Sequence, residues 1–168
     1  NDIIALQEIS KAYLNAKEYK KVVEINRRII TMSPQDVAAF TNMGLAYSAL
    51  GQWEKAIADY SRSLELKADN PLVRFKLGEA YESTGKIKEA LEQYRLVLAK
   101  VPNALQAMSA LAGAALKAGN YDESIKWYSE AGRRQPRNAS VRRPARMHAL
   151  VATRALLEVD QEDVLCVH

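Results

Sequence analysis

Cysteine and histidine, which often act as nucleophiles, bases or metal ligands, are scarce in this chain and lie near its C-terminal end. The single cysteine, Cys166, lies two residues from His168, and the other histidine is His148. A cysteine nucleophile needs a base within hydrogen-bond reach and a third group that orients the base. Nothing near Cys166 would orient His168. The sequence also lacks the ligand spacing of a metal site and a glycine-rich phosphate loop. We therefore expect no catalytic site, no metal and no cofactor.

A second candidate for chemistry is a stretch of arginines in residues 133–154, which contain no acidic residue. Guanidinium groups can bind phosphates or an acidic partner. Nucleic-acid binding usually adds aromatic side chains for stacking, and residues 129–168 contain none. Nucleic acid is therefore the less favoured partner, and a solubilising cap is the alternative interpretation. The residues of this basic patch are Arg133, Arg134, Arg137, Arg142, Arg143, Arg146 and Arg154.

The composition is that of a folded chain with an uneven charge. Apolar residues make up 48% of the 168 residues, and no apolar run is long enough to span a membrane. The net charge of +4 comes mainly from the arginine stretch, which an acidic tail follows. One cysteine allows no internal disulfide, which favours a reducing, cytoplasmic compartment. Because residue 1 is Asn, we expect a piece of a longer chain whose targeting segment or further domains lie outside it.

A 34-residue period organises most of the sequence. Tyrosine and glycine recur at this spacing, and proline falls on the same grid at three of four places. A fixed period of this length indicates one unit of secondary structure that is copied and stacked. The main columns are Tyr13, Tyr47 and Tyr81; Tyr60, Tyr94 and Tyr128; Gly51, Gly85 and Gly119; and Pro34, Pro102 and Pro136.

Residues 37–70 show how one unit is built. Apolar residues at helical spacing predict a first helix that ends before Gly51, where glycine allows a left-handed turn. A second helical stripe begins at Trp53, and Asn70 is placed to cap the following helix at Pro71. The small residue Gly44 lets the two helices of the hairpin approach closely. The register predicts helices that start near residues 3, 19, 37, 53, 71, 87, 105 and 121, with no strand.

These columns resemble the tetratricopeptide repeat. The family pattern is an aromatic, then Leu-Gly, then Tyr, and later Ala, an aromatic and Pro, at fixed spacing. Residues 37–70 and 71–104 match it well, whereas 3–36 and 105–138 match it less closely. The best copy reads Phe40, Met43, Gly44, Tyr47, Ala56 and Tyr60. In the first copy, Ser10, Val22 and Asn26 occupy the Gly, Ala and aromatic columns.

The resemblance implies an all-α fold, a right-handed solenoid of antiparallel hairpins. Residues 1–138 would form four repeats, at about 3–36, 37–70, 71–104 and 105–138. The period breaks after Asn138, and we expect a capping helix over residues 139–158, kinked or late-starting at Pro144. Residues 159–168 would form an acidic tail.

The resemblance also implies a non-catalytic scaffold that binds a peptide or helix of a partner protein in a groove lined by the first helices. A solvated helix face is the alternative to such a groove. A clamp for the C-terminal carboxylate of chaperones is disfavoured, since Leu72 stands where a polar residue is needed. A docking region of a larger enzyme also stays open. The predicted groove residues are Gln7, Lys11, Asn15, Thr41, Asn42, Leu45, Leu72, Phe75, Lys76, Glu79, Glu82, Ser109 and Lys117.

Overall fold

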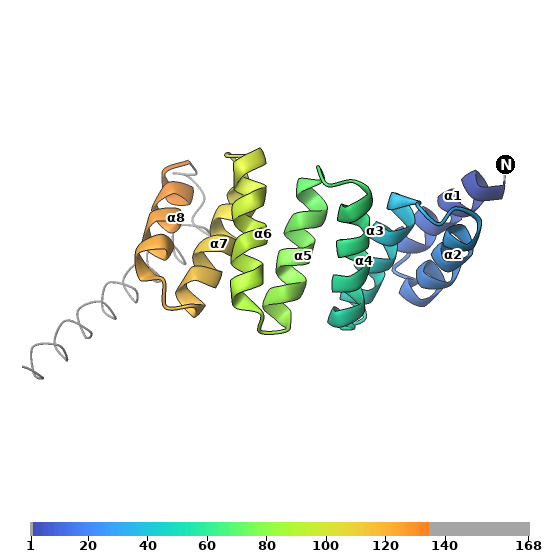
Figure 1. The fold of residues 1–168 in the computed structure, drawn as a ribbon, viewed down its shortest axis with the longest axis horizontal. Helices are drawn as coiled ribbons and strands as arrows, with labels where there is room; N and C mark the ends of the chain where they lie inside the picture. The colour runs from blue at the N-terminus through green and yellow to red at the C-terminus, as the bar shows by residue number, and fades with distance from the viewer. Residues whose placement is uncertain (1, 135–168) are drawn as a thin grey trace, which may run out of the picture. The chain divides into compact units, whose positions relative to one another are not determined.

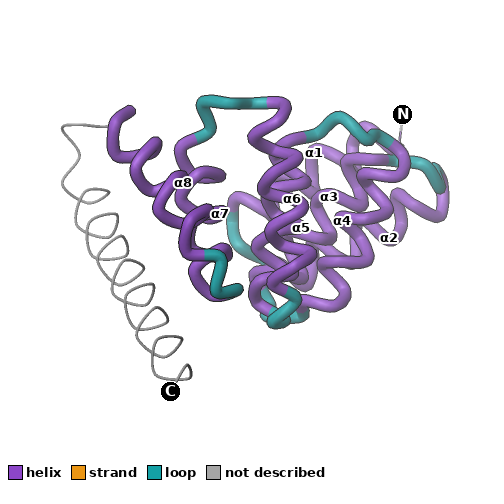
Figure 2. The backbone as a smooth tube through the Cα atoms, turned by 60° about the vertical axis from the view of Figure 1, so that its left-hand side comes forward, coloured by secondary structure: helices purple, strands orange, loops and turns teal. Residues whose placement is uncertain are grey.

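A computed structural model describes residues 2–134, and these residues form helices joined by short turns, with no strand among them (Figure 2). Each hairpin turn has three residues, and each linker between repeats has four. Seven helices begin at the residue that the repeat register predicts, and the first begins one residue earlier. The helices are α1 Asp2–Asn15, α2 Tyr19–Met32, α3 Val37–Ala49, α4 Trp53–Leu66, α5 Pro71–Ser83, α6 Ile87–Lys100, α7 Leu105–Lys117 and α8 Tyr121–Arg134.

The middle residue of each three-residue hairpin turn explains where the first helix ends. Gly51, Gly85 and Gly119 all adopt a left-handed backbone, with φ of 71°, 75° and 76°. Glycine takes this conformation without the steric cost that a side chain would add. The first hairpin places Lys17 in the same column, and Lys17 also has a positive φ of 60°. The turn geometry is therefore kept even where the glycine is missing.

Contacts divide the chain into two compact units, one ending at Lys86 and the other beginning at Ile87. The boundary falls between α5 and α6, which the sequence assigns to one repeat. In the first unit, each helix packs against the next, and the first helices also meet across repeats, α1 against α3 and α3 against α5 (Figure 1). In the second unit, α7 packs between α6 and α8.

The core of the first unit lies between α3, α4 and α5. Tyr60 and Ala56 of α4 are fully buried there beside Met43 of α3 and Leu77 of α5. Gly44 lies against this tyrosine: a Cβ atom at Gly44 would be only 2.6 Å from Cδ1 and Cε1 of the Tyr60 ring. The small residue of the repeat thus makes room for the aromatic residue of the paired helix.

In the first hairpin, polar residues occupy the positions of this small residue and this aromatic residue. Ser10 replaces the glycine, Asn26 replaces the aromatic residue, and both side chains are fully buried. Asn26 Nδ2 donates to Ser10 Oγ at 2.6 Å and to the carbonyl oxygen of Val22 at 2.7 Å. In the sequence, Ser10 and Asn26 are two separate departures from the family pattern. In the structure they bond to each other, so each substitution compensates for the other.

Candidate protein-binding groove

The first helices of the first unit bring most of the predicted groove residues into one row. Because α1 contacts α3 and α3 contacts α5, the residues assigned to the groove on these three helices lie on adjacent elements. Ser109 and Lys117 are on α7, which belongs to the second unit. The structure therefore does not bring these two residues together with the others.

Several predicted groove residues on α1 and α3 already hold hydrogen bonds within the fold. Gln7 Nε2 donates to Asp36 Oδ2 at 2.8 Å, and Asn42 Nδ2 donates to Ser10 Oγ at 3.3 Å. Thr41 Oγ1 donates to the carbonyl oxygen of Val37 at 2.9 Å. Thr41 Oγ1 also shares a hydrogen bond with Ser63 Oγ of α4 at 2.8 Å. These side chains thus link α1, α3 and α4, a role that the sequence did not indicate. Lys11 and Asn15 are exposed on α1.

The apolar part of the row runs from α3 to α5. Leu45 is half-buried and packs against the core of the unit, whereas Leu72 at the start of α5 is 63% exposed. The ring of Phe75 is half-buried one turn further along α5. Leu72 is thus the large apolar side chain of this row that is most open to a partner, and Leu45 supports the fold beneath it.

The charged part of the row contains an ion pair over an aromatic ring. Lys76 Nζ lies 2.7 Å from Glu79 Oε2 and 5.7 Å from the centre of the Phe75 ring. An ammonium group over an aromatic face is attracted by the ring quadrupole. Glu79 and Glu82 are the two acids among the predicted groove residues, and Lys76, one turn before Glu79 on α5, already pairs with Glu79. The net charge presented here is therefore smaller than the count of acids suggests.

The basic patch is described only at its first two members. Arg134 Nε donates to Glu130 Oε1 at 2.8 Å, and Arg133 Nη1 lies 3.5 Å from Glu130 Oε2. Residues 133–154 contain no acid, but Glu130, one turn before these two arginines on α8, pairs with both of them. Arg137, Arg142, Arg143, Arg146 and Arg154 lie outside the described residues, as do His148, Cys166, His168 and the expected capping helix and tail.

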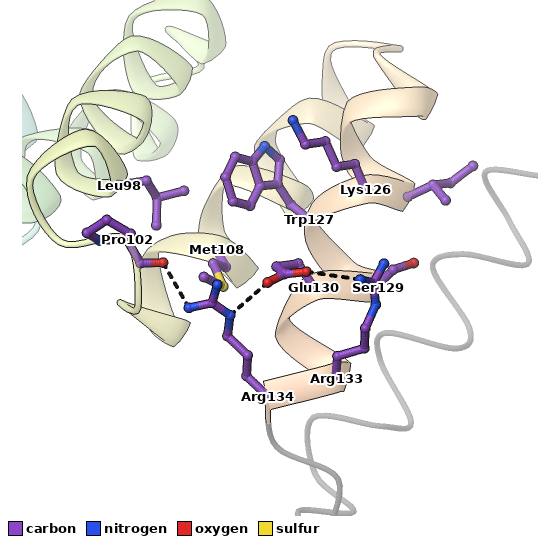
Figure 3. A pocket seen from close by; sticks show the side chains of 10 residues that line it. Leu98, Pro102, Met108, Lys126, Trp127, Ser129, Glu130, Arg133 and Arg134 are labelled. Carbon is purple, nitrogen blue, oxygen red and sulfur yellow. Dashed lines mark hydrogen bonds and ion pairs between the residues drawn. The ribbon is translucent and has the colours of Figure 1, made fainter.

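The second unit contains a cavity that the sequence did not predict. It has a volume of about 620 Å³, and Leu98, Met108 and Trp127 line it (Figure 3). Arg134 closes one side through its bonds to Glu130 and to the carbonyl oxygen of Pro102. The ring of Trp127 is half-buried, and helical spacing alone does not distinguish such a ring from a core residue.

One buried carboxyl group lies away from the groove. Burial raises the pKa of Asp59 on α4 to about 6, and the nearby charge of Arg27 opposes this increase. Asp59 Oδ2 is buried without a hydrogen-bond partner. Arg27 itself donates from Nη2 to the Tyr47 hydroxyl at 3.0 Å. This carboxyl group makes the stability of the fold depend on pH.

Family models match the chain from the second repeat to the fourth. A model of the TPR repeat matches residues 44–85, and a tetratricopeptide repeat model matches residues 83–139. The chain belongs to the tetratricopeptide repeat family. Proteins of this fold are typically non-catalytic interaction scaffolds, and the repeats support that general role here.

Solved tetratricopeptide repeat structures share the fold. A MamA fragment from Desulfovibrio magneticus RS-1 superposes with a TM-score of 0.80 at 16% identity, and the match covers 96% of this chain and 97% of that one. A crystal structure of MamA gives 0.78 at 21% identity, covering 83% and 82%. Another MamA structure gives 0.76 at 21% identity, covering 83% and 76%. No curated protein sequence matches the chain.

Among residues 2–134, no helix is both long and apolar enough to cross a membrane. Within the same range, no three His, Cys, Asp or Glu side chains are grouped so that they could hold a metal ion.

Proposed function

We propose that the first helices of the first unit bind a peptide or helix of a partner protein, with Leu72 and Phe75 as the central apolar contact. The observation that carries this proposal is Leu72, a leucine that is 63% exposed beside a half-buried aromatic ring. Isolated exposed leucines are common on protein surfaces. This one differs because it adjoins a row of first helices whose polar side chains are already held in place.

The bonds along α1 and α3 support a preorganised surface. Gln7 is held by Asp36, and Asn42 is held by Ser10. A surface whose side chains are already ordered loses less conformational entropy when a partner binds. Aromatic anchors near an interface centre commonly carry a large share of the affinity, which is the role proposed for Phe75.

The charges on α5 suggest the chemistry of the partner. Lys76 now sits between Glu79 and the face of Phe75. A basic side chain of a partner could replace Lys76 at both sites, so we propose a ligand that combines an apolar residue with a Lys or Arg. Under this proposal Lys76→Glu strengthens binding by removing the competitor, and Glu79→Lys weakens it. Because these groups are partly solvated, both effects should shrink as salt increases.

A photocrosslinking experiment tests where the partner binds. A benzoylphenylalanine placed at Leu72 should form an adduct with the partner in the cells that make the protein. The matched control places the same group at Ala58, which is exposed on α4 and outside the groove. Adducts that form at residue 58 and not at residue 72 would rule out the groove. The basic patch beginning at Arg133 would then be the next surface to test.

A further inference from the structure

One face of each first helix is built from the same three columns of the repeat. In α3, α5 and α7 these columns are apolar and at most 7% exposed: Ala39, Met43 and Ala46; Val73, Leu77 and Ala80; and Ala107, Leu111 and Ala114. In α1 the columns hold Ala5, Ile9 and Ala12, which are equally apolar. All three are exposed, Ile9 by 42%. We call these three residues the α1 outer face.

The helix that covers this face elsewhere is always the second helix of the preceding hairpin. Within their units, α2 packs on α3, α4 packs on α5, and α6 packs on α7. In the first unit, Val23 and Ile30 of α2 pack against the cluster that contains Met43, and Leu64 of α4 belongs to the cluster of Val73 and Leu77. The face is therefore a contact surface for one kind of helix.

At the end of an array, the outer face of the first helix is expected to be more polar than the same face in an internal repeat. Terminal repeats usually carry a polar outer face, because no neighbour shields it from water. The α1 outer face instead keeps the composition of an internal repeat, with alanines that permit close approach around one larger aliphatic residue.

From this we infer that the α1 outer face is a docking site for an amphipathic helix of the kind that α2, α4 and α6 represent. The chain itself defines the chemistry of that helix. Two aliphatic residues seven positions apart recur in α2, α4 and α6: Val23 and Ile30, Ile57 and Leu64, and Leu91 and Leu98. The partner helix carries the same pair on one face and polar residues on the other.

A fusion of the full chain to a copy of its own helix tests this inference. A second copy of residues 87–104, which contain α6 and its linker, is joined directly before Ile3, the column equivalent of Leu105. The added helix should raise the urea midpoint of the first unit, followed by Trp53 fluorescence in a Trp127→Phe background. Amide hydrogens of the added segment should become protected from exchange, since docking orders it.

Charge substitutions on α1 show whether the added helix raises the midpoint by docking on the α1 outer face. Ile9→Glu should cancel the rise in midpoint in the fused chain, yet change the unfused chain little because Ile9 is exposed there. Asn15→Glu adds the same charge to the same helix, at another exposed position, and should leave the rise intact.

Three results would overturn the inference. The fused segment could leave the midpoint unchanged and remain unprotected from exchange. The rise in midpoint could survive Ile9→Glu or disappear with Asn15→Glu, which would place the added helix on another surface. Finally, sedimentation could show that the unfused chain self-associates and that Ile9→Glu dissolves the oligomer. The occupant would then be a second copy of this chain and not a separate helix.

Discussion

Gly44 and Tyr60 show how a single side chain sets the distance between two helices. Tyr60 is fully buried, so its ring has little room to retreat from an atom placed 2.6 Å away. Alanine normally favours a helix over glycine by about 1 kcal/mol, whereas overpacking a core costs about 1–3 kcal/mol. At Gly44 the second effect should win.

We therefore expect Gly44→Ala to lower the free energy of unfolding of the first unit by about 1 kcal/mol. Gly132→Ala is the matched control, because a Cβ atom there meets nothing within 4 Å on α8; it should be neutral or stabilising. Urea unfolding read by Trp53 for the first variant and by Trp127 for the second measures both. A loss of stability of similar size at both glycines would contradict the packing described for Gly44.

Asp59 provides a pH-dependent prediction. Its folded-state pKa of about 6 lies above the ordinary value of 3.8, because burial disfavours the charged form. The folded protein therefore holds this proton more tightly than the unfolded chain, and stability falls as pH rises between these two values. Asp59→Asn removes this penalty, so the variant should be more stable than the parent at pH 7.

We expect a gain of about 1 kcal/mol at pH 7, well below what the full shift would give, because the carboxyl group is partly solvated. The difference should be small near pH 4 and disappear near about pH 3, where the aspartic acid is protonated in the folded protein and mostly protonated in the unfolded chain. Urea midpoints of parent and variant across this range measure it. A constant difference at all pH values would show that charge at Asp59 is not the cause.

At the scale of elements, the linkers between repeats carry unequal caps. Asp36 Oδ1 accepts from the backbone nitrogen of Ala39 at 2.7 Å, and the same carboxylate holds Gln7 of α1. Asn70, one period later, accepts from the nitrogen of Val73 at 3.3 Å. Ala104, one further period on, gives no side-chain cap to α7. The equivalent positions thus contribute differently to stability.

Asp36→Ala should cost about 1–2 kcal/mol, since it removes a cap and leaves the Gln7 amide without its partner. Asn70→Ala should cost less, about 0.5–1 kcal/mol. The bond from Val73 to the Asn70 side chain is longer, and the described contacts give Asn70 no bond to another helix like the one between Asp36 and Gln7. Urea unfolding followed by Trp53 fluorescence compares the two. If Asn70→Ala proves the more damaging substitution, the Asp36–Gln7 contact does not contribute in solution.

The repeat register allowed the helices to be predicted closely, and the same reasoning could not predict the polar contacts. Helix starts follow from local signals, such as the left-handed turn at Gly51 and the cap at Asn70, which sequence spacing records directly. The Ser10–Asn26 bond and the Lys76 contact with Phe75 depend on side-chain directions in space. Spacing predicted which residues share a helix face, but not which of them already partner one another.

At the scale of the whole molecule, both proposed binding surfaces belong to the first of the two units. The groove residues that the structure brings together come from α1, α3 and α5, all of which end before Lys86. The proposed docking site on α1 lies in the same unit but uses different columns of the repeat. A groove ligand and a docked helix are thus expected to respond to different substitutions, Leu72→Glu for the first and Ile9→Glu for the second.

The central claim is most directly tested by the affinity of a peptide for the groove. Peptides selected from a displayed library against the full chain should contain an apolar residue near a Lys or Arg, and titration calorimetry gives the dissociation constant of the best one. Leu72→Glu should raise that constant at least tenfold, about 1.4 kcal/mol, with unchanged helicity. The matched variant Ala58→Glu on α4 should alter it less than about twofold. Equal weakening by both substitutions, or by neither, would contradict binding at Leu72 and Phe75.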